Sequence, residues 1–301
     1  MPVDLLKEKR VIEDFLGQTD SRLSSFSFVN LFSWKDFFDF DLQVIDGNLC
    51  VFAQNVTGCF LYLPPLGKRI SEKAIGECFR IMNTINKNSG VSRIENVEEG
   101  QLKFFPQAPY AAFKKYDEYV YVREEIAQLQ GTKFKSQRCA CNYFTKHYAH
   151  DFLPYDSGMS EECFSLYEQW AGQRGRSCRD GVYRQMLEEN RSVHRLLLQE
   201  HKQLGLVGRV IRIDDTIRAY TFGFRLNNET FCVLLEIADL QAKGIAPYVF
   251  SRFCADETLR HYPFINAMDD FGMENIQRTK LSFRPCRMVP AYVVSRKRNE
   301  R

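Results

Sequence analysis

Three residues, Gln241, Gly244 and Ala246, stand in the order Q-x-x-G-x-A where an apolar run ends and a helical pattern begins. A helix N-terminus exposes unpaired backbone N–H groups and a partial positive charge, so it attracts phosphate. Glycine lets the backbone approach a ligand closely, and alanine leaves space for it. One interpretation is a phosphate cradle for an activated donor, made by Gln241, Lys243, Gly244, Ile245 and Ala246. The other is an ordinary connection from a strand to a helix.

Two carboxylates near this turn are candidates for a general base. Glu236 lies near the end of the apolar run before the turn, and Asp270 follows the next predicted strand, residues 264–268. Because strand ends beside the turn converge on one cleft, either carboxylate is placed to take a proton from an incoming amine. Asp270 fits equally well as a cap for the short helix predicted over residues 274–281.

The same segment carries further charged side chains. As substrate-binding residues they would hold an amine or an anionic group, and as surface residues they would only be solvated. These candidates are Asp269, Arg278, Lys280 and Arg284.

The stretch over residues 133–150 is basic and aromatic. Lys133, Lys135, Arg138 and Lys146 alternate with aromatic residues, a composition that suits either a nucleic-acid patch or a solvated helix face with its aromatics in the core. The C-x-C spacing of its two cysteines matches no common zinc pattern, so no metal is expected here.

A pattern of strands and helices that occurs twice must position these residues. Each half has two strands around a tight turn, Asp46-Gly47 in the first half and Asp214-Asp215 in the second. A third strand and an amphipathic helix follow each pair, and hairpins with one later crossover helix predict a mixed sheet in an α+β fold. The predicted elements are a hairpin, strand and helix over 42–54, 58–67 and 71–88, the same over 208–226, 231–237 and 244–261, and a last strand over 288–295.

The two halves differ at the turn before the helix. The first half has Gly67 followed by Lys68 and Arg69, but it lacks the Q-x-x-G-x-A spacing. If both halves share one fold, we therefore expect only the second to keep an anion-binding turn. Between the halves, helical patterns cover residues 124–131, 133–150, 160–173 and 181–204.

Composition limits the class of protein. The chain has 301 residues, enough for two domains, and a net charge of only +3, too small to indicate a nucleic-acid or membrane partner by itself. No run reaches the length of a membrane span or a signal peptide, and the ten cysteines are scattered singly. We therefore expect a cytoplasmic protein with reduced thiols.

Four segments together resemble one family, namely NLFSWKDFFDFDLQVIDGNL, LYLPPLGK, DEYVYVREEIAQLQGTKFKSQRCACNYFTKHY and INAMDDFGMENIQRTKLSFRP. They are similar to the soluble bacterial members of the phosphatidylglycerol lysyltransferase C-terminal domain family, over nearly the whole chain. The resemblance implies two tandem GNAT-like (acyl-CoA N-acyltransferase) domains, as in the Fem peptidoglycan aminoacyltransferases. Each would be a mixed, mostly antiparallel sheet flanked by helices. We expect a degenerate domain over 1–118 and a domain with the donor site over 119–301.

The resemblance also implies an activity. Characterised relatives transfer an aminoacyl group from charged tRNA to a lipid headgroup, whereas Q-x-x-G-x-G/A turns hold acyl-CoA in GNAT enzymes. We expect an acyl- or aminoacyltransferase that uses aminoacyl-tRNA or a CoA thioester and an amine or hydroxyl acceptor. The chain lacks the membrane-spanning flippase region of the lipid-modifying enzymes, so the acceptor stays open. The alternative is a catalytically degenerate binding or regulatory protein.

Overall fold

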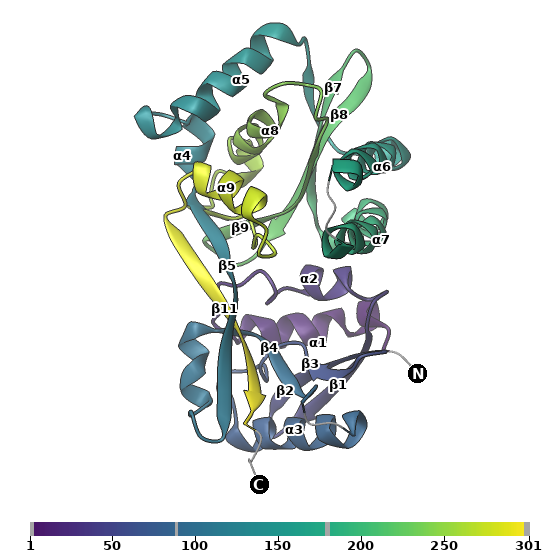
Figure 1. Ribbon diagram of the computed structural model, residues 1–301, viewed down its shortest axis with the longest axis vertical. Coiled ribbons are helices and arrows are strands. Elements are labelled where there is room, and N and C mark those ends of the chain that lie inside the picture. Colours follow the sequence, from purple (N-terminus) through teal and green to yellow (C-terminus); the bar gives the residue numbers. More distant parts are fainter. Residues whose placement is uncertain (1–2, 88–89, 178–180, 298–301) are drawn as a thin grey trace. The chain divides into compact units, whose positions relative to one another are not determined.

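The computed structural model describes residues 3–87, 90–177 and 181–297. These residues form two compact units (Figure 1). The first unit comprises the described residues of Met1–Glu118, Asp269–Gly272 and Met288–Arg301, and the second comprises those of Tyr119–Met268 and Met273–Arg287. The chain first passes from one unit to the other between Glu118 and Tyr119, and most of the last strand groups with the first unit.

The described residues of the first unit form a sheet with three α-helices and one 3-10 helix. Its sheet begins with a hairpin whose turn residues Asp46 and Gly47 both have positive φ, 49° and 78°, as a two-residue hairpin turn requires. The strand order is β1-β2-β3-β4-β11-β5. The elements are α1 (Leu5–Gly17), α2 (Phe28–Ser33), β1 (Asp39–Ile45), β2 (Asn48–Asn55), β3 (Gly58–Leu61), α3 (Glu72–Asn86), β4 (Arg93–Glu98), the 3-10 helix η1 (Glu99–Phe104), and parts of β5 (Tyr110–Val122) and β11 (Arg287–Arg296).

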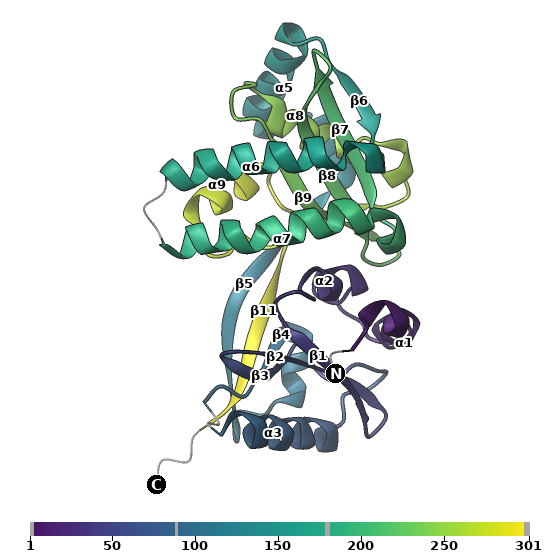
Figure 2. The ribbon, with the colours of Figure 1, turned by 90° about the vertical axis from the view of Figure 1, so that its right-hand side faces the viewer.

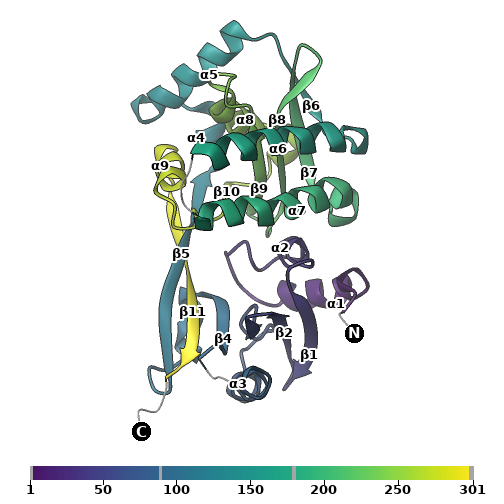
Figure 3. The ribbon, with the colours of Figure 1, turned by 45° about the vertical axis from the view of Figure 1, so that its right-hand side comes forward.

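The second unit has helices on both faces of its sheet, with the strand order β5-β10-β9-β8-β7-β6. Helices α6 and α7 run side by side over one face (Figures 2 and 3), and α8 packs on the other face with α5 against it. The elements are α4 (Arg123–Gln128), η2 (Thr132–Phe134), α5 (Lys135–His147), β6 (Asp151–Pro154), η3 (Ser157–Met159), α6 (Ser160–Ser177), α7 (Gly181–Leu204), β7 (Val207–Ile213), β8 (Thr216–Arg225), β9 (Thr230–Ala238), α8 (Ile245–Cys254), η4 (Glu257–Leu259), β10 (Phe264–Asn266) and α9 (Glu274–Ser282).

Both units repeat one order of elements, which confirms the mixed α+β fold. Three antiparallel strands precede a helix, and the next strand then pairs in parallel with the third. The parallel pair is β3 with β4 in the first unit and β9 with β10 in the second. The strand that follows each parallel pair comes from a different part of the chain. In the first unit β11 pairs with β4, whereas in the second unit β5 pairs with β10.

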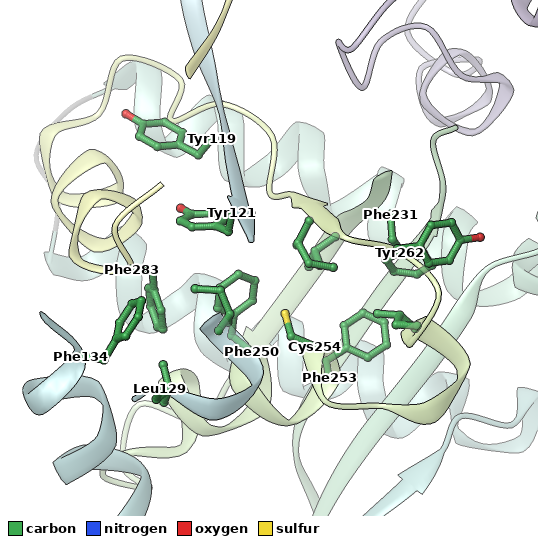
Figure 4. Packing of buried hydrophobic residues seen from close by; sticks show 14 of the residues in the cluster. Tyr119, Tyr121, Leu129, Phe134, Phe231, Phe250, Phe253, Cys254, Tyr262 and Phe283 are labelled. Atoms are coloured by element: carbon green, nitrogen blue, oxygen red, sulfur yellow. The ribbon is translucent and has the colours of Figure 1, made fainter. Parts of the chain in front are cut away.

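An aromatic core lies on the α8 face of the second unit (Figure 4). The Phe250 ring of α8 packs against Tyr121 and Phe283, with ring centroids 5.7 Å and 5.0 Å apart. The short apolar helix is therefore fixed against the sheet, and with it the turn that precedes it. No helix among the described residues is long and apolar enough to cross a membrane. The nine described cysteines are free thiols, and Cys178 lies outside the described residues.

Candidate active site

The turn before α8 is built around Gly244. This residue is the N-cap of α8 and has a φ of 88°, a conformation that favours glycine. A Cβ at this position would lie 2.2 Å from the carbonyl oxygen of Ala140 and 3.2 Å from Cβ of Phe144. Both neighbours belong to α5. The close approach that glycine allows here is thus made by the backbone of a helix of the same chain.

The backbone donors of this turn are partly used within the chain. The N–H of Gln241 donates to Oδ1 of Asp239 at 2.9 Å, and the N–H of Ile245 donates to the Ala242 carbonyl at 3.1 Å. The Asp239 carboxylate also accepts from Arg218 at 2.9 Å. A phosphate at this turn would therefore meet a carboxylate and only some of the helix-terminal N–H groups.

The side chains of the turn point in different directions. Gln241, Lys243 and Ala246 are exposed, whereas Ile245 is buried in the cluster between α8 and the sheet. The Lys243 ammonium lies 4.6 Å from the ring centroid of Tyr143, which in turn stacks on His147. The exposed side of this turn is thus cationic and aromatic.

Glu236 is the most unusual carboxylate of the second unit. Its Oε2 atom is buried and has no hydrogen-bond partner among the described residues. Burial raises its pKa to about 8, although the positive charge of Lys280 acts in the opposite direction. A group with this pKa can exchange a proton near neutral pH.

A β-bulge determines where Glu236 points. Phe222 pairs with Leu235 and Gly223 with Val233, so Leu234 is an extra residue in β9. Without the bulge, regular alternation would turn the Glu236 side chain to the other face of the sheet. With it, Glu236 shares the α8 face with Val233.

Lys280 of α9 contacts the backbone just after the end of β10. Its ammonium donates to the carbonyls of Ala267 and Met268, the latter at 3.2 Å, and lies 5.6 Å from the Tyr119 ring centroid. The cation that acts on Glu236 is therefore anchored by backbone oxygens. The structure thus brings Glu236 and Lys280 into one electrostatic environment.

One edge of β9 is open next to Glu236. The short strand β10 pairs with β9 only from Thr230 to Cys232. Beyond Cys232, no described strand pairs with this side of β9, although β9 continues to Ala238. An extended ligand can pair with backbone groups along such an edge.

Asp269 and Asp270 lie in the loop that follows β10, and their contacts place them in the first unit. Each carboxylate accepts a backbone N–H two residues ahead, from Phe271 at 2.8 Å and from Gly272 at 2.9 Å. The N-cap of α9 is Met273, so Asp270 does not cap that helix. Asp270 is buried, with 5% of its surface exposed.

The two other cations of this segment are exposed. Arg278 forms a 2.6 Å ion pair with Glu274 one turn earlier in α9. Arg284 follows the helix and has a φ of 56°. The predicted role of either residue in binding a substrate is not tested by these contacts, and it stays a prediction.

The basic stretch contains cations with partners in the chain and cations that are only exposed. Arg138 donates to the carbonyls of Leu129 and Gly131 at 2.6 Å and 2.9 Å, which satisfies the end of α4, and Lys133 pairs with Glu125 at 2.7 Å. The remaining cations of the stretch, Lys135 and Lys146, are exposed on α5. Sequence reasoning did not separate these two groups.

A family model described as "Phosphatidylglycerol lysyltransferase, C-terminal" matches residues 17–295. A conserved protein of unknown function from Bacteroides thetaiotaomicron is similar in structure, with 24% identity, a TM-score of 0.85 and 97% of each chain covered. L-PGS from Bacillus licheniformis is 16% identical, with a TM-score of 0.67 and coverage of 97% of this chain and 92% of that one.

A tandem GNAT protein from the clavulanic acid biosynthesis pathway is 6% identical, with a TM-score of 0.52 and coverage of 98% and 97%. No curated protein matches the chain. These likenesses confirm the expected architecture of a GNAT-like fold in tandem.

Proposed function

Because the chain belongs to the family of the phosphatidylglycerol lysyltransferase C-terminal domain, we propose that it transfers an activated acyl or aminoacyl group to an amine or hydroxyl. The observation that carries this proposal is Glu236, whose carboxyl group has a buried, unpaired oxygen and a pKa near 8 beside the open edge of β9. A general base works best when its pKa lies near the working pH.

The transfer needs no intermediate on the protein. The acceptor nitrogen or oxygen attacks the donor carbonyl, its new bond to carbon forms, and the bond from carbon to the ribose oxygen or the CoA sulfur breaks. Glu236 in its ionised form takes the one proton that the acceptor loses and passes it to the leaving group, so the protons balance and the carboxylate is regenerated. Backbone groups at the bulge around Leu234 would support the donor carbonyl and its developing negative charge.

Lys280 has a supporting role in this proposal. Its positive charge opposes the effect of burial on Glu236, so a fraction of the carboxylate is ionised at neutral pH. Asp270 is the alternative base, with Asp269, Arg278 and Arg284 as candidates for binding the acceptor. Replacing Glu236 or Asp270 by its amide distinguishes the two bases, because only loss of the true base abolishes the transfer step.

We propose aminoacyl-tRNA as the donor. The backbone of α5 packs directly on Gly244, and the Asp239 carboxylate accepts the N–H of Gln241, so the turn is poorly suited to a pyrophosphate. The exposed Lys135 and Lys146 with the stacked Tyr143 and His147 give α5 the charge and aromatic character that suit a nucleic-acid backbone.

Acyl-CoA is the second candidate donor. Gln241, Lys243 and Ala246 keep an exposed face at the N-terminus of α8, and a phosphate could bind to that face without displacing α5. Either donor would deliver its acyl group toward the same carboxylate.

The test compares binding of charged tRNA to the protein with the stabilisation of the protein by CoA against thermal unfolding. For the tRNA donor we expect the protein to bind charged tRNA at low salt, and a Lys135→Glu, Lys146→Glu double variant to bind it several-fold more weakly. The slope of log affinity against log salt concentration should also fall in that variant, by about the release of two counterions. The matched control reverses two exposed lysines of the first unit, Lys7 and Lys73, and should bind as the unaltered protein does.

A donor is assigned by consumption as well as by binding. If the protein cleaves the ester of aminoacyl-tRNA and the Glu236 variant does not, the donor is aminoacyl-tRNA. If it releases the free thiol of CoA instead, the donor is acyl-CoA. If the protein consumes neither donor while each variant stays folded, the transferase proposal is wrong and a binding or regulatory role replaces it.

A further inference from the structure

A second polar atom lies opposite Glu236 and is also unpaired. Thr221 of β8 is the direct cross-strand partner of Glu236 in β9. Its side chain is fully buried, and its Oγ1 atom has no hydrogen-bond partner among the described residues. Side chains of such a pair share one face of the sheet, with Cβ atoms ~5 Å apart.

The surroundings of this pair are apolar. The next pair on the same face of the sheet is Ala219 with Ala238, and both pack in the cluster with Val249 of α8. A buried polar atom without a partner destabilises a fold, and most are avoided. Two such atoms at facing positions, one of them on the strand with the open edge, therefore indicate a place where a ligand supplies the missing hydrogen bonds.

We propose that Thr221 Oγ1 and Glu236 Oε2 together form a binding site for a primary amine of the substrate. This inference rests on the proposed function and deepens it, because it adds Thr221 to the site and assigns the chemical class of the group bound there. An amine carries several N–H donors and one lone pair, so one nitrogen can bond both side chains at once. An acetyl methyl group would leave both oxygens unpaired.

The proton balance of this site follows from its neighbours. The titratable groups that act on or near Glu236 are Lys280 of α9 and the buried thiol of Cys254 in α8. Since burial raises the pKa of Glu236 to about 8, the carboxyl and a free ammonium each hold a proton at neutral pH. The bound pair shares one proton, so binding releases one, and affinity should rise by up to about tenfold per pH unit below about pH 8.

The amine has two sources, the amino group of an aminoacyl donor and the nucleophile of the acceptor. Binding of glycinamide, ethylamine and acetamide distinguishes these two sources. Glycinamide and acetamide differ only in the amino group, and ethylamine has the amino group but lacks the carbonyl. Binding is followed by NMR titration of the intact protein. Glycinamide alone binding well indicates the donor, whereas equal binding of glycinamide and ethylamine indicates the acceptor.

Substitutions at Thr221 test its part in the site. Thr221→Val keeps the shape of the side chain and should weaken amine binding by about tenfold, the effect of one lost hydrogen bond. Thr221→Ser keeps the hydroxyl and should bind nearly as well as the unaltered protein. In Glu236→Gln the rise of affinity with pH should disappear.

A purely structural role predicts a different result. If Thr221 only supports the fold, Thr221→Val lowers the melting temperature. If its hydroxyl is reserved for a ligand, the melting temperature of the unliganded variant stays the same or rises, because an unpaired buried oxygen has been removed.

The inference is overturned if acetamide binds as tightly as glycinamide, or if Thr221→Val binds amines unchanged. It is also overturned if that variant loses stability and amine binding together while Thr221→Ser restores only stability. Amine binding that needs both residues, in a protein that consumes no donor, would retain this inference and refute only the proposed transferase.

Discussion

A glutamate lies on one strand of the parallel pair in each unit, Glu95 on β4 and Glu236 on β9, and the two carboxyl groups differ in their partners and in the direction of their pKa shifts. Glu95 in β4 of the first unit accepts from Nε of Arg93 at 2.5 Å and from Nζ of Lys115 at 3.0 Å. Burial alone would raise its pKa, but Lys115 and Arg93 together lower it below its usual value. Glu236 has an unpaired oxygen, and its pKa is raised.

The difference separates a structural carboxylate from a candidate catalytic one. A buried charge that is fully paired has no capacity left for a ligand, and removing one member of the pair destabilises the fold. A buried carboxyl with an unpaired oxygen and a raised pKa has that capacity, and such groups are concentrated at functional sites. The same order of elements therefore serves packing in one unit and, in our proposal, chemistry in the other.

The turns before the two helices give the largest expected effect. Gly244→Ala should destabilise the second unit by about 3 kcal/mol, because it combines a positive φ with a Cβ 2.2 Å from the backbone of α5. Gly67→Ala in the first unit should cost only about 1 kcal/mol, since its Cβ would meet a side-chain nitrogen of Asn48 at 3.0 Å. Chemical denaturation measures both values, and equal losses would contradict the close packing of α5 on the turn.

Removing each carboxylate gives the next effect. Glu95→Gln should lower stability by about 2 kcal/mol, a value reduced for solvent screening because Arg93 and Lys115 are partly exposed. Glu236→Gln should raise stability at neutral pH, since the carboxyl must take up a proton on folding there and the amide need not, while transfer activity is lost. A large loss of stability in Glu236→Gln would mean that this carboxylate has a structural partner.

The two carboxylates should also give opposite dependences on pH. The folded-state pKa of Glu95 is lowered, so its stabilising contribution is present above about pH 4.5 and is lost as the pH falls. The folded-state pKa of Glu236 is raised, so its contribution is present below about pH 4.5 and is lost as the pH rises toward about 8, by up to about 1.4 kcal/mol per unit. Melting curves of Glu236→Gln should diverge from those of the unaltered protein above pH 5. Parallel curves would show that Glu236 titrates normally.

The sequence predicted the repeated order of strands and helices and the turn before α8, because hairpin residues and helical periodicity are local signals. It could not predict which face Glu236 occupies. In a regular hairpin Thr221 would face Leu235, and only the bulge at Leu234 brings Thr221 opposite Glu236. The packing of Ala140 on Gly244 and the pairing of β11 with β4 were equally hidden, since both join segments far apart in the chain.

The smallest expected effect concerns how each helix begins. The Ser71 hydroxyl accepts the N–H of Ala74 and caps α3 in the first unit, whereas Gly244 has no side chain to cap α8. Ser71→Ala should therefore lower stability by about 1 kcal/mol, and Ser71→Thr should retain most of it. The capping oxygen already occupies the place where an anion would bind, so neither variant should change binding of any donor. A change in donor binding on altering Ser71 would show that the turn of the first unit also takes part in recognition, and the contrast between the two units would then be one of degree.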